Sequence, residues 1–186
     1  MTTTPPPEHL REEVDSILIG EKEIAARVRE LAADIERDFA EKDLLVVALL
    51  TGTVPFLADL VRHITLPLRL DFMGVSSYGN NTTPGELVFT KELKLEAKNR
   101  DVLLVDDILD TGRTLRAVID KLNALQPRSL RTCVLLEKKS RRSEKITADY
   151  VGFDVPDAFV VGYGLDYAEK YRNLPFIGIL KPDVYA

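Results

Sequence analysis

The chain has 186 residues, of which 45% are hydrophobic and 30% are charged, and its formal net charge is −5. This length favours one domain with a buried core, and no apolar run approaches the roughly 20 residues that a membrane-spanning helix needs. The acidic charge argues mildly against general nucleic-acid binding. Cys133, the single cysteine, excludes an internal disulfide and is expected to be buried and unreactive.

The N-terminal segment MTTTPPPEHL has neither a basic start nor an apolar core. We therefore expect residues 1–10 to form a flexible tail rather than a signal peptide, and we expect a cytoplasmic protein. Residues 11–186 contain no internal repeat and no linker-like segment, which predicts a single domain.

Short apolar runs alternate with helical patterns along this domain. Strands are predicted at 14–20, 43–50, 66–75, 101–107, 129–139, 159–165 and 176–180, and helices at 21–39, 54–64 and 114–125. Residues 76–86 have almost no apolar content and are predicted to form a long loop. Fully apolar strands that alternate with helices are typical of a parallel sheet covered on both faces. The predicted fold is therefore α/β, with an open, mostly parallel, twisted sheet flanked by helices.

Ligands of such open sheets bind beyond the carboxyl ends of the strands. Three predicted loops lie there, and they follow Leu50, follow Asp107 and surround Asp166. These loops are the first candidates for a functional site.

The segment VLLVDDILDTGRTL, residues 102–115, combines an apolar strand with three acids and a turn. Its residues 110–114 precede a predicted helix, where free N–H groups, the helix dipole and two threonine hydroxyls attract an anion. Gly112 permits a close backbone approach or a positive φ. The nucleotide P-loop spacing G-x-x-x-x-G-K-[ST] is absent, so a nucleoside triphosphatase is not expected.

The two adjacent acids of this segment suit a different task. The carboxylates of Asp106 and Asp107 can accept hydrogen bonds from vicinal sugar hydroxyls or face a hydrated Mg²⁺. A phosphorylated sugar would satisfy the acids and the turn together. The alternative from the residues alone is that Asp110 caps the helix, while Asp106 and Asp107 are solvated residues at the strand end.

The same segment resembles the phosphoribosyl-pyrophosphate signature of the type I phosphoribosyltransferases, and of their hypoxanthine-guanine branch in particular. Four further segments resemble that branch in the same order, namely LLTGTVPFLADL (49–60), SSYGN (76–80), LLEKK (135–139) and residues 151–180. The resemblance implies the type I phosphoribosyltransferase fold, with a small hood built from the N- and C-terminal segments.

The activity that this resemblance implies is purine salvage. A 5-phosphoribosyl group would pass from phosphoribosyl pyrophosphate to N9 of hypoxanthine, guanine or xanthine, with Mg²⁺, giving IMP or GMP and pyrophosphate. Homodimers or homotetramers are usual for the family, with no nucleic-acid or membrane partner.

The resemblance also implies a role for each matching residue. Asp110 would be the catalytic proton acceptor at purine N7, and Asp106 and Asp107 would hold the ribose hydroxyls or water molecules on the metal. The 5′-phosphate would be bound by Asp110, Thr111, Gly112, Arg113 and Thr114. Pyrophosphate would be bound by Thr51, Gly52 and Arg172, and Asp166 would bind Mg²⁺ directly.

The purine pocket and its lid follow from the same comparison. Lys138 would donate to purine O6, Phe159 would stack on the base, and Val160 would meet the base edge through its backbone. Ser77 and Tyr78 would belong to a lid that excludes water. The neighbours of Lys138 are still predicted, from the residues alone, to form a solvated basic loop. They are Lys139, Arg141, Arg142 and Lys145.

One position departs from the family pattern. The loop after the second strand commonly carries a basic residue before its glycine, but here it reads LLTGT, with Thr51 in that place. Pyrophosphate binding would then depend more on backbone amides, Arg172 and metal. The family's non-proline cis bond in this loop is expected at Leu50–Thr51.

Two other classes share part of the pattern. An RNA-binding pyrimidine-operon regulator has the same fold and a similar VDD…TGRT segment, but the place of Asp110 is usually not acidic there. A phosphoacceptor signalling receiver starts with a strand like VLLVDD, but here that strand lies beyond residue 100 and no later apolar strand ends in a lone aspartate.

Overall fold

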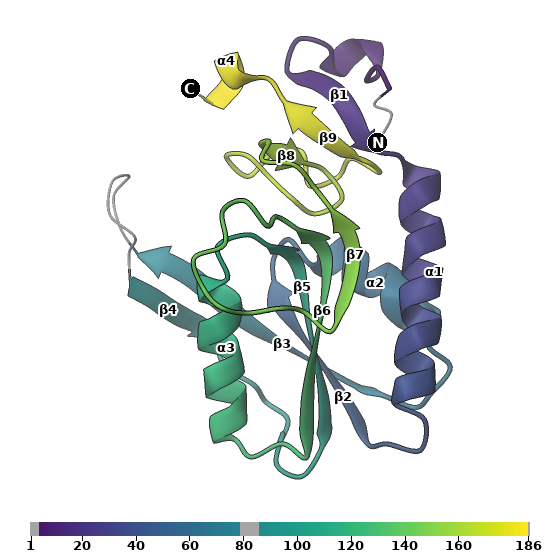
Figure 1. Ribbon diagram of the computed structural model, residues 1–186, viewed down its shortest axis with the longest axis vertical. Helices are drawn as coiled ribbons and strands as arrows, with labels where there is room; N and C mark the ends of the chain where they lie inside the picture. Colours follow the sequence, from purple (N-terminus) through teal and green to yellow (C-terminus); the bar gives the residue numbers. More distant parts are fainter. Residues whose placement is uncertain (1–3, 79–85, 186) are drawn as a thin grey trace.

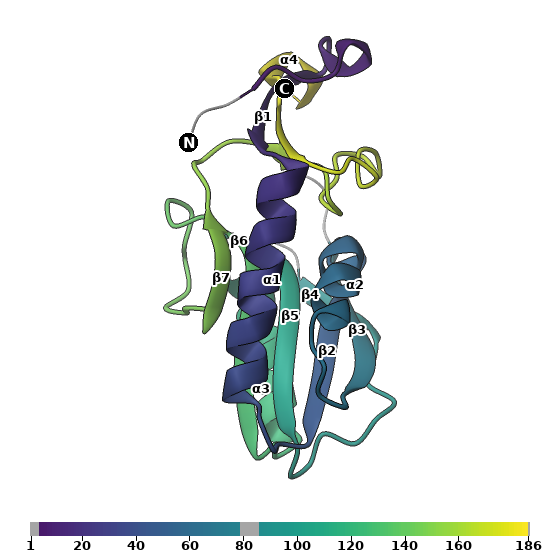
Figure 2. The same cartoon turned by 90° about the vertical axis from the view of Figure 1, so that its right-hand side faces the viewer.

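The computed structural model describes residues 4–78 and 86–185, and it contains two sheets of different size (Figures 1 and 2). The large sheet has six strands in the order β4-β3-β2-β5-β6-β7. All neighbouring pairs are parallel except β3 and β4. These strands are β2 (Leu44–Leu50), β3 (Arg69–Tyr78), β4 (Glu86–Lys91), β5 (Asp101–Leu109), β6 (Ser129–Glu137) and β7 (Tyr150–Asp154). The predicted open, mostly parallel α/β sheet is therefore confirmed.

The small sheet forms a hood beyond the carboxyl end of the large one (Figure 1). It joins β1 (Val14–Ile19), β9 (Ile177–Leu180) and β8 (Val160–Val161) in antiparallel order. Strands from the two ends of the chain thus pair with each other, as the predicted hood requires.

Helices cover both faces of the large sheet. α1 (Glu21–Asp38) and α2 (Val54–Arg62) lie on one face and α3 (Arg113–Ala124) on the other (Figure 2). Alternate residues of β2 are buried on opposite faces of the sheet, because successive strand side chains point in opposite directions. Val46 and Ala48 pack in the cluster that contains α1 and α2, whereas Val47 and Leu49 pack in the cluster that contains α3. This two-sided burial explains why the strand reads as one continuous apolar run.

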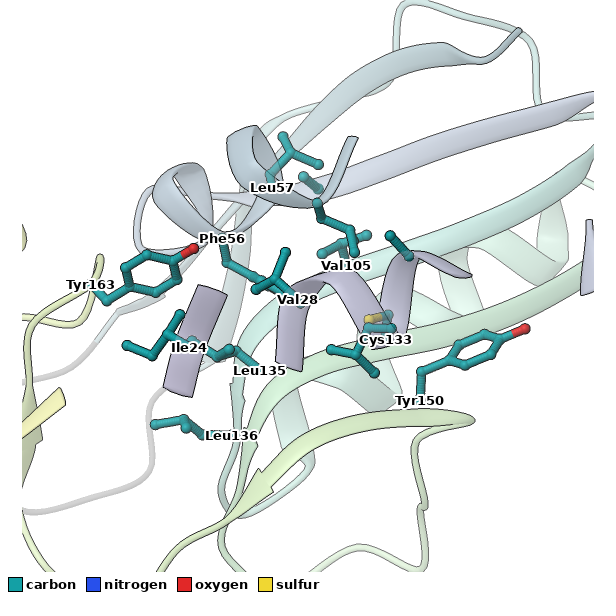
Figure 3. Packing of buried hydrophobic residues seen from close by; sticks show 14 of the residues in the cluster. Ile24, Val28, Phe56, Leu57, Val105, Cys133, Leu135, Leu136, Tyr150 and Tyr163 are labelled. Carbon is teal, nitrogen blue, oxygen red and sulfur yellow. The ribbon is translucent and has the colours of Figure 1, made fainter. Parts of the chain in front are cut away.

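Figure 3 shows the first of these clusters, with Phe56 of α2, Val28 of α1 and Cys133 of β6 pointing toward one another. Cys133 is fully buried, and burial raises the pKa of its thiol far above the ordinary value. The expectation of a buried, unreactive cysteine agrees with this environment.

The predicted bounds of the loop at 76–86 are wrong at both ends. β3 continues through Tyr78, and β4 begins at Glu86 and runs antiparallel to β3. Polar side chains occur here because β4 is an edge strand, which is not covered on both faces. The backbones of Ser77 and Tyr78 belong to β3, but their side chains and residues 79–85 lie outside the described part of the chain. Their assignment to a lid stays a prediction.

Other boundaries also differ from the pattern. The strand predicted at 159–165 is only β8, because Gly162, Tyr163 and Gly164 all have positive φ and turn the chain. β7 was not predicted, nor were the short helices η1 (Glu8–Leu10) and α4 (Pro182–Tyr185). Elements this short carry too few residues for a periodic signal.

Two buried tyrosines hold the loop between β8 and β9, Tyr163 to α2 and Tyr171 to the N-terminal part of the hood. The hydroxyl of Tyr163 donates to Asp59 of α2 at 2.6 Å, and its ring lies close to Phe56 in Figure 3. The hydroxyl of Tyr171 donates to Glu13 at 2.9 Å. These contacts hold the loop between β8 and β9 over the carboxyl end of the large sheet.

The first described residues of the chain make contacts with the hood. Thr4 bridges to Ile17, and Leu10 is buried in a cluster with Val14 and Phe176. The boundary between a tail and a domain at residue 10 stays a prediction. Across residues 4–78 and 86–185, no helix is both long and apolar enough to cross a membrane.

Candidate active site

Three loops meet where the hood approaches the large sheet. A Cβ atom on Gly52 would overlap Oδ2 of Asp107, and one on Gly164 would overlap the carbonyl oxygen of Gly52. The loop after β2, the end of β5 and the loop after β8 therefore touch with no room for a side chain at Gly52. The loops named from the sequence come together in the fold.

Two carboxylates lie at this meeting point, and Asp106 is buried while Asp107 is half-buried. Oδ1 of Asp106 accepts hydrogen bonds from the backbone N–H of Asp107 at 3.0 Å and from the hydroxyl of Thr53 at 3.3 Å. Burial and the neighbouring charge of Asp107 raise the pKa of Asp106 well above its ordinary value. Burial also raises the pKa of Asp107, against the opposing effects of backbone hydrogen bonds and the positive charge of Arg172. The alternative of solvated strand-end acids is wrong, because the sheet and the hood enclose them.

The turn after β5 forms an anion cradle. Gly112 has φ of 88° and precedes α3, whose first turn contains no acidic residue. A cavity of about 230 Å³ lies against residues 106–112 and Thr114. The start of α3, where backbone N–H groups can bind an anion, thus borders this cavity.

Asp110 does not cap this helix. The residue at the cap position is Gly112, and the N–H of Arg113 in the first turn donates to the hydroxyl of Thr111 at 3.4 Å. Instead, Oδ1 of Asp110 is buried and has no hydrogen-bond partner within the described part of the chain, while Oδ2 lies 3.4 Å from Arg141. A buried acceptor without a donor is unfavourable, so this oxygen is free for a ligand.

Lys138 lies near Asp110, on the loop that follows β6. It is only 5% exposed, and its ammonium group donates to the carbonyl of Ala158 at 2.6 Å. Burial lowers the pKa of Lys138, and the negative charge of Asp110 opposes that effect. An acceptor and a donor thus stand together in one partly enclosed region.

Arg142 is the functional-site residue that the sequence interpretation missed. Its side chain is 15% exposed and donates to four carbonyls and one carboxylate at 2.6–3.3 Å. The acceptors are Leu109, Asp110, Lys138, Ile146 and Glu137. The prediction of a solvated side chain is wrong for Arg142, because the loop folds back over the end of β5. Lys139, Arg141 and Lys145 are exposed, as predicted.

The same loop also supports the anion cradle directly. The backbone N–H groups of Ser143 and Glu144 donate to the carbonyl of Thr111 at 3.0 and 3.1 Å. The cradle is therefore held from outside by the segment that carries Lys138 and Arg142. No sequence motif marks this support, since the bonds use backbone atoms.

The aromatic candidate lies on the hood. Phe159 directly precedes β8, and Val160 is buried in that strand. A second cavity, of about 220 Å³, is lined by Lys138, Arg141, Asp157, Ala158, Phe159 and Tyr185. Lys138 and Phe159, which the resemblance assigned to one ligand, thus border the same space.

Arg172 and Asp166 form an ion pair on the loop between β8 and β9. Their atoms Nη2 and Oδ1 are 3.0 Å apart, and Nη1 of Arg172 donates to the carbonyl of Gly164 at 2.9 Å. Arg172 also approaches Glu169 at 3.1 Å. The pair therefore stands beside the point where Gly52 and Asp107 meet.

The acids of this region fit a magnesium ion held together with substrate. Mg²⁺ commonly uses one or two carboxylates plus substrate phosphates. Burial raises the pKa values of the neighbouring carboxyl groups of Asp106 and Asp107, and Asp166 lies on the loop that approaches them. Among residues 4–78 and 86–185, no set of three or more His, Cys, Asp or Glu side chains is placed to hold an ion without substrate.

The loop after β2 has the conformation that the sequence predicted. The Leu50–Thr51 peptide bond is cis, Thr51 is exposed, and Gly52 is buried. The carbonyl of Thr51 accepts from the N–H of Val54 at 3.2 Å. Thr51 brings no positive charge to this loop.

Comparisons with known proteins agree with this architecture. Residues 14–168 match the model of the family described as "Phosphoribosyl transferase domain". The hypoxanthine-guanine phosphoribosyltransferase of Bacillus subtilis is 46% identical over 177 residues, covering 95% of this chain and 98% of that protein. The enzyme of the same name from Streptococcus mutans is 45% identical over 178 residues, covering 95% and 99%. A crystal structure of a hypoxanthine phosphoribosyltransferase from Staphylococcus aureus superimposes with a TM-score of 0.91 at 43% identity, covering 96% and 98%.

The buried acids predict a pH-dependent stability of the unliganded protein. Folding raises the pKa of Asp106 above its ordinary value of 3.8. At pH values above 3.8 the folded state therefore binds more protons than the unfolded state, and the free energy of unfolding falls as the pH rises. Asp106→Asn keeps the acceptor oxygen but removes the charge. We expect this variant to have a higher urea midpoint than the parent at pH 7.5, and the difference to shrink toward pH 4.

The measurement uses urea unfolding in chelating buffer without substrate. Asp120→Asn, at an exposed position of α3, is the matched control and should leave the midpoint nearly unchanged at both pH values. A lower midpoint for Asp106→Asn at pH 7.5 would show that the buried charge is fully compensated.

The network of Arg142 predicts a large loss of stability on substitution. Arg142→Met leaves Glu137 and the carbonyls without their donor, which should lower the free energy of unfolding by about 3 kcal/mol, as for other broken buried ion pairs. The exposed neighbour offers the control Lys139→Met, for which we expect a much smaller loss, because surface ion pairs contribute little. Equal losses in denaturant titrations of the two variants would contradict the network.

Proposed function

The chain belongs to the phosphoribosyl transferase family, and on this basis we propose that it transfers the 5-phosphoribosyl group of phosphoribosyl pyrophosphate to N9 of a 6-oxopurine. The products are IMP or GMP and pyrophosphate, which makes the reaction one of purine salvage. The observation that carries the proposal is that Oδ1 of Asp110, which has no hydrogen-bond partner among the described residues, lies in the same region as the buried donor Lys138, next to the anion cradle of α3.

The reaction forms the bond between purine N9 and the anomeric carbon, and it breaks the bond from that carbon to pyrophosphate. Positive charge develops on the sugar in the transition state, and the purine loses a proton. Asp110 is proposed to accept or share that proton at N7, since its free carboxylate oxygen can approach the ring. Asp106 and Asp107 are proposed to hold the ribose hydroxyls, and their charge favours a cationic sugar.

The phosphates are proposed to occupy two places. The 5′-phosphate binds in the cradle of residues 110–114, where backbone N–H groups at the start of α3 can bind an anion. Pyrophosphate lies by the loop of Thr51 and Gly52 and by Arg172, which stands near it on the hood. A basic residue in place of Thr51 would neutralise part of the pyrophosphate charge. Because Thr51 is uncharged, Arg172 and the metal would have to neutralise more of it.

The metal is proposed to be Mg²⁺. Asp166 would bind it directly, and Asp106 and Asp107 through water molecules. When bound, Mg²⁺ neutralises the charge that accumulates on the departing pyrophosphate. Oδ1 of Asp166 also pairs with Arg172 at 3.0 Å, so the metal and Arg172 would share this carboxylate or compete for it.

The purine is selected by the hydrogen-bond donor that faces its sixth position. Lys138 can donate to the O6 of hypoxanthine, guanine or xanthine, but it meets another donor in the amine of adenine. Phe159 is proposed to stack on the base and Val160 to meet its edge. This arrangement favours the three 6-oxopurines over adenine.

Neither alternative class is supported. The relatives reported above are purine phosphoribosyltransferases over nearly their full length, and the comparisons give no support to an RNA-binding regulator. A signalling receiver does not fit a chain in which residues 14–168 match the phosphoribosyl transferase family. We further propose that the enzyme acts in the cytoplasm as a homodimer or homotetramer without a nucleic-acid or membrane partner.

The decisive experiment is an absorbance assay with phosphoribosyl pyrophosphate, Mg²⁺ and each purine in turn. We expect turnover with hypoxanthine or guanine and far less with adenine. Absence of turnover with hypoxanthine, guanine and xanthine would refute the proposed function. A parallel RNA gel shift should show no tight, salt-sensitive binding.

Asp110→Asn tests the proposed proton acceptor. The amide keeps the size of the side chain but cannot take a proton, so kcat should fall by about a hundredfold or more. The dissociation constant for phosphoribosyl pyrophosphate, measured by calorimetry, should change far less. An equal loss of affinity and rate would mean that Asp110 acts by shaping the cradle.

A further inference from the structure

Tyr185, the last described residue, stacks on the aromatic ring proposed to bind the purine. The ring centroids of Tyr185 and Phe159 are 4.8 Å apart and their planes differ by 25°. Tyr167 meets Phe159 at 5.5 Å with nearly perpendicular planes. Phe159 therefore belongs to a three-ring group built from three separate segments of the chain.

The backbone of the hood brings the C-terminal turn to this place. β9 pairs with β8 through Val160 and Ile179, and the N–H of Leu180 donates to the carbonyl of Phe159 at 2.8 Å. α4 follows at once, and its Val184 packs in the cluster that includes Phe159 and Leu180. The path from the strand pair to Tyr185 is short, which limits where its ring can lie.

The chain is held on its other side as well. The N–H of Lys181 donates to the carbonyl of Glu13 at 2.9 Å, and its ammonium group donates to the carbonyl of Arg11 at 2.6 Å. The start of α4 is thus tied to the N-terminal segment. The stacking of Tyr185 follows from a defined docking of the C-terminal turn.

α4 lies on the outer part of the hood, away from the large sheet, in both overall views (Figures 1 and 2). Tyr185 also lines the cavity of about 220 Å³ that contains Lys138 and Phe159. Because Tyr185 stacks on one face of the Phe159 ring, a base that stacks on Phe159 would take the other face.

We propose that Tyr185 is a positioning residue for purine binding, because it fixes the ring of Phe159 as a platform for the base. This inference rests on the proposed function. A half-buried phenylalanine can change its ring orientation, and a base that stacks on it must then restrict that motion. A second ring already stacked behind it removes part of this cost before the purine binds.

The hydroxyl group of Tyr185 is not part of this role. No hydrogen bond from it is present among residues 4–78 and 86–185, and the residue is 37% exposed. The contact depends on the flat ring alone. A phenylalanine should therefore replace Tyr185, whereas an aliphatic side chain of similar bulk should not.

The test compares Tyr185→Leu with Tyr185→Phe in steady-state kinetics with hypoxanthine and guanine. We expect Tyr185→Leu to raise KM for the purine about three- to tenfold, which is the range that the loss of one aromatic pair supports. KM for phosphoribosyl pyrophosphate and kcat should stay within about twofold, because the cradle and Asp110 are unchanged. Tyr185→Phe and the exposed-site control Asp183→Asn should behave as the parent.

Each other outcome overturns the inference in a distinct way. An unchanged purine KM in Tyr185→Leu means that Phe159 needs no support, and a lower purine KM means that Tyr185 obstructs the base. Equal rises in both KM values, with a lowered thermal midpoint, mean a general packing role.

Calorimetric titration of the parent and of Tyr185→Leu with IMP and GMP separates this inference from the proposed function. If the parent binds neither nucleotide and turns over no purine, the proposed function fails. If the parent binds them and Tyr185→Leu binds equally well, only the role of Tyr185 fails.

Discussion

The desolvation of two adjacent carboxylates at the end of β5 is the constraint around which this molecule is organised. Asp106 and Asp107 lose hydration at the edge of the large sheet and repel each other, so each must find compensation nearby. Thr53, the local backbone and the charge of Arg172 supply part of it. In the proposed function, ribose hydroxyls and a metal ion would add to this compensation.

The hood and the basic loop can be understood as supports for this region. The loop after β8 reaches Gly52 and Asp107 because the hood is tied to α2 through Tyr163 and Asp59. On the other side, Arg142 connects the end of β5 to the segment of Lys138. Rigid support on both sides keeps the acids and donors of this region close together, which is typical of preorganised sites.

Some elements of the fold follow from local patterns, and others do not. The strands β2 and β5 and the helices α1 and α3 were predictable because burial on one or both faces imposes a long apolar pattern. β4, β7 and β8 were misplaced or missed, since edge strands and two-residue strands carry little pattern of their own. Arg142 was misjudged for a similar reason, because its acceptors are mostly backbone carbonyls, and two of these lie at the end of β5.

The sequence by itself determined the chemistry of the candidate site: three acids and an anion-binding turn in one segment, with further segments of the same family in the same order. These features are local, so they can be recognised directly from the residue types. Only the tertiary structure decided which groups meet. It buried Asp106, left one oxygen of Asp110 without a partner and brought Tyr185 onto Phe159. Such encounters depend on strand order and loop packing, which join residues far apart in the chain and leave no mark in any single segment.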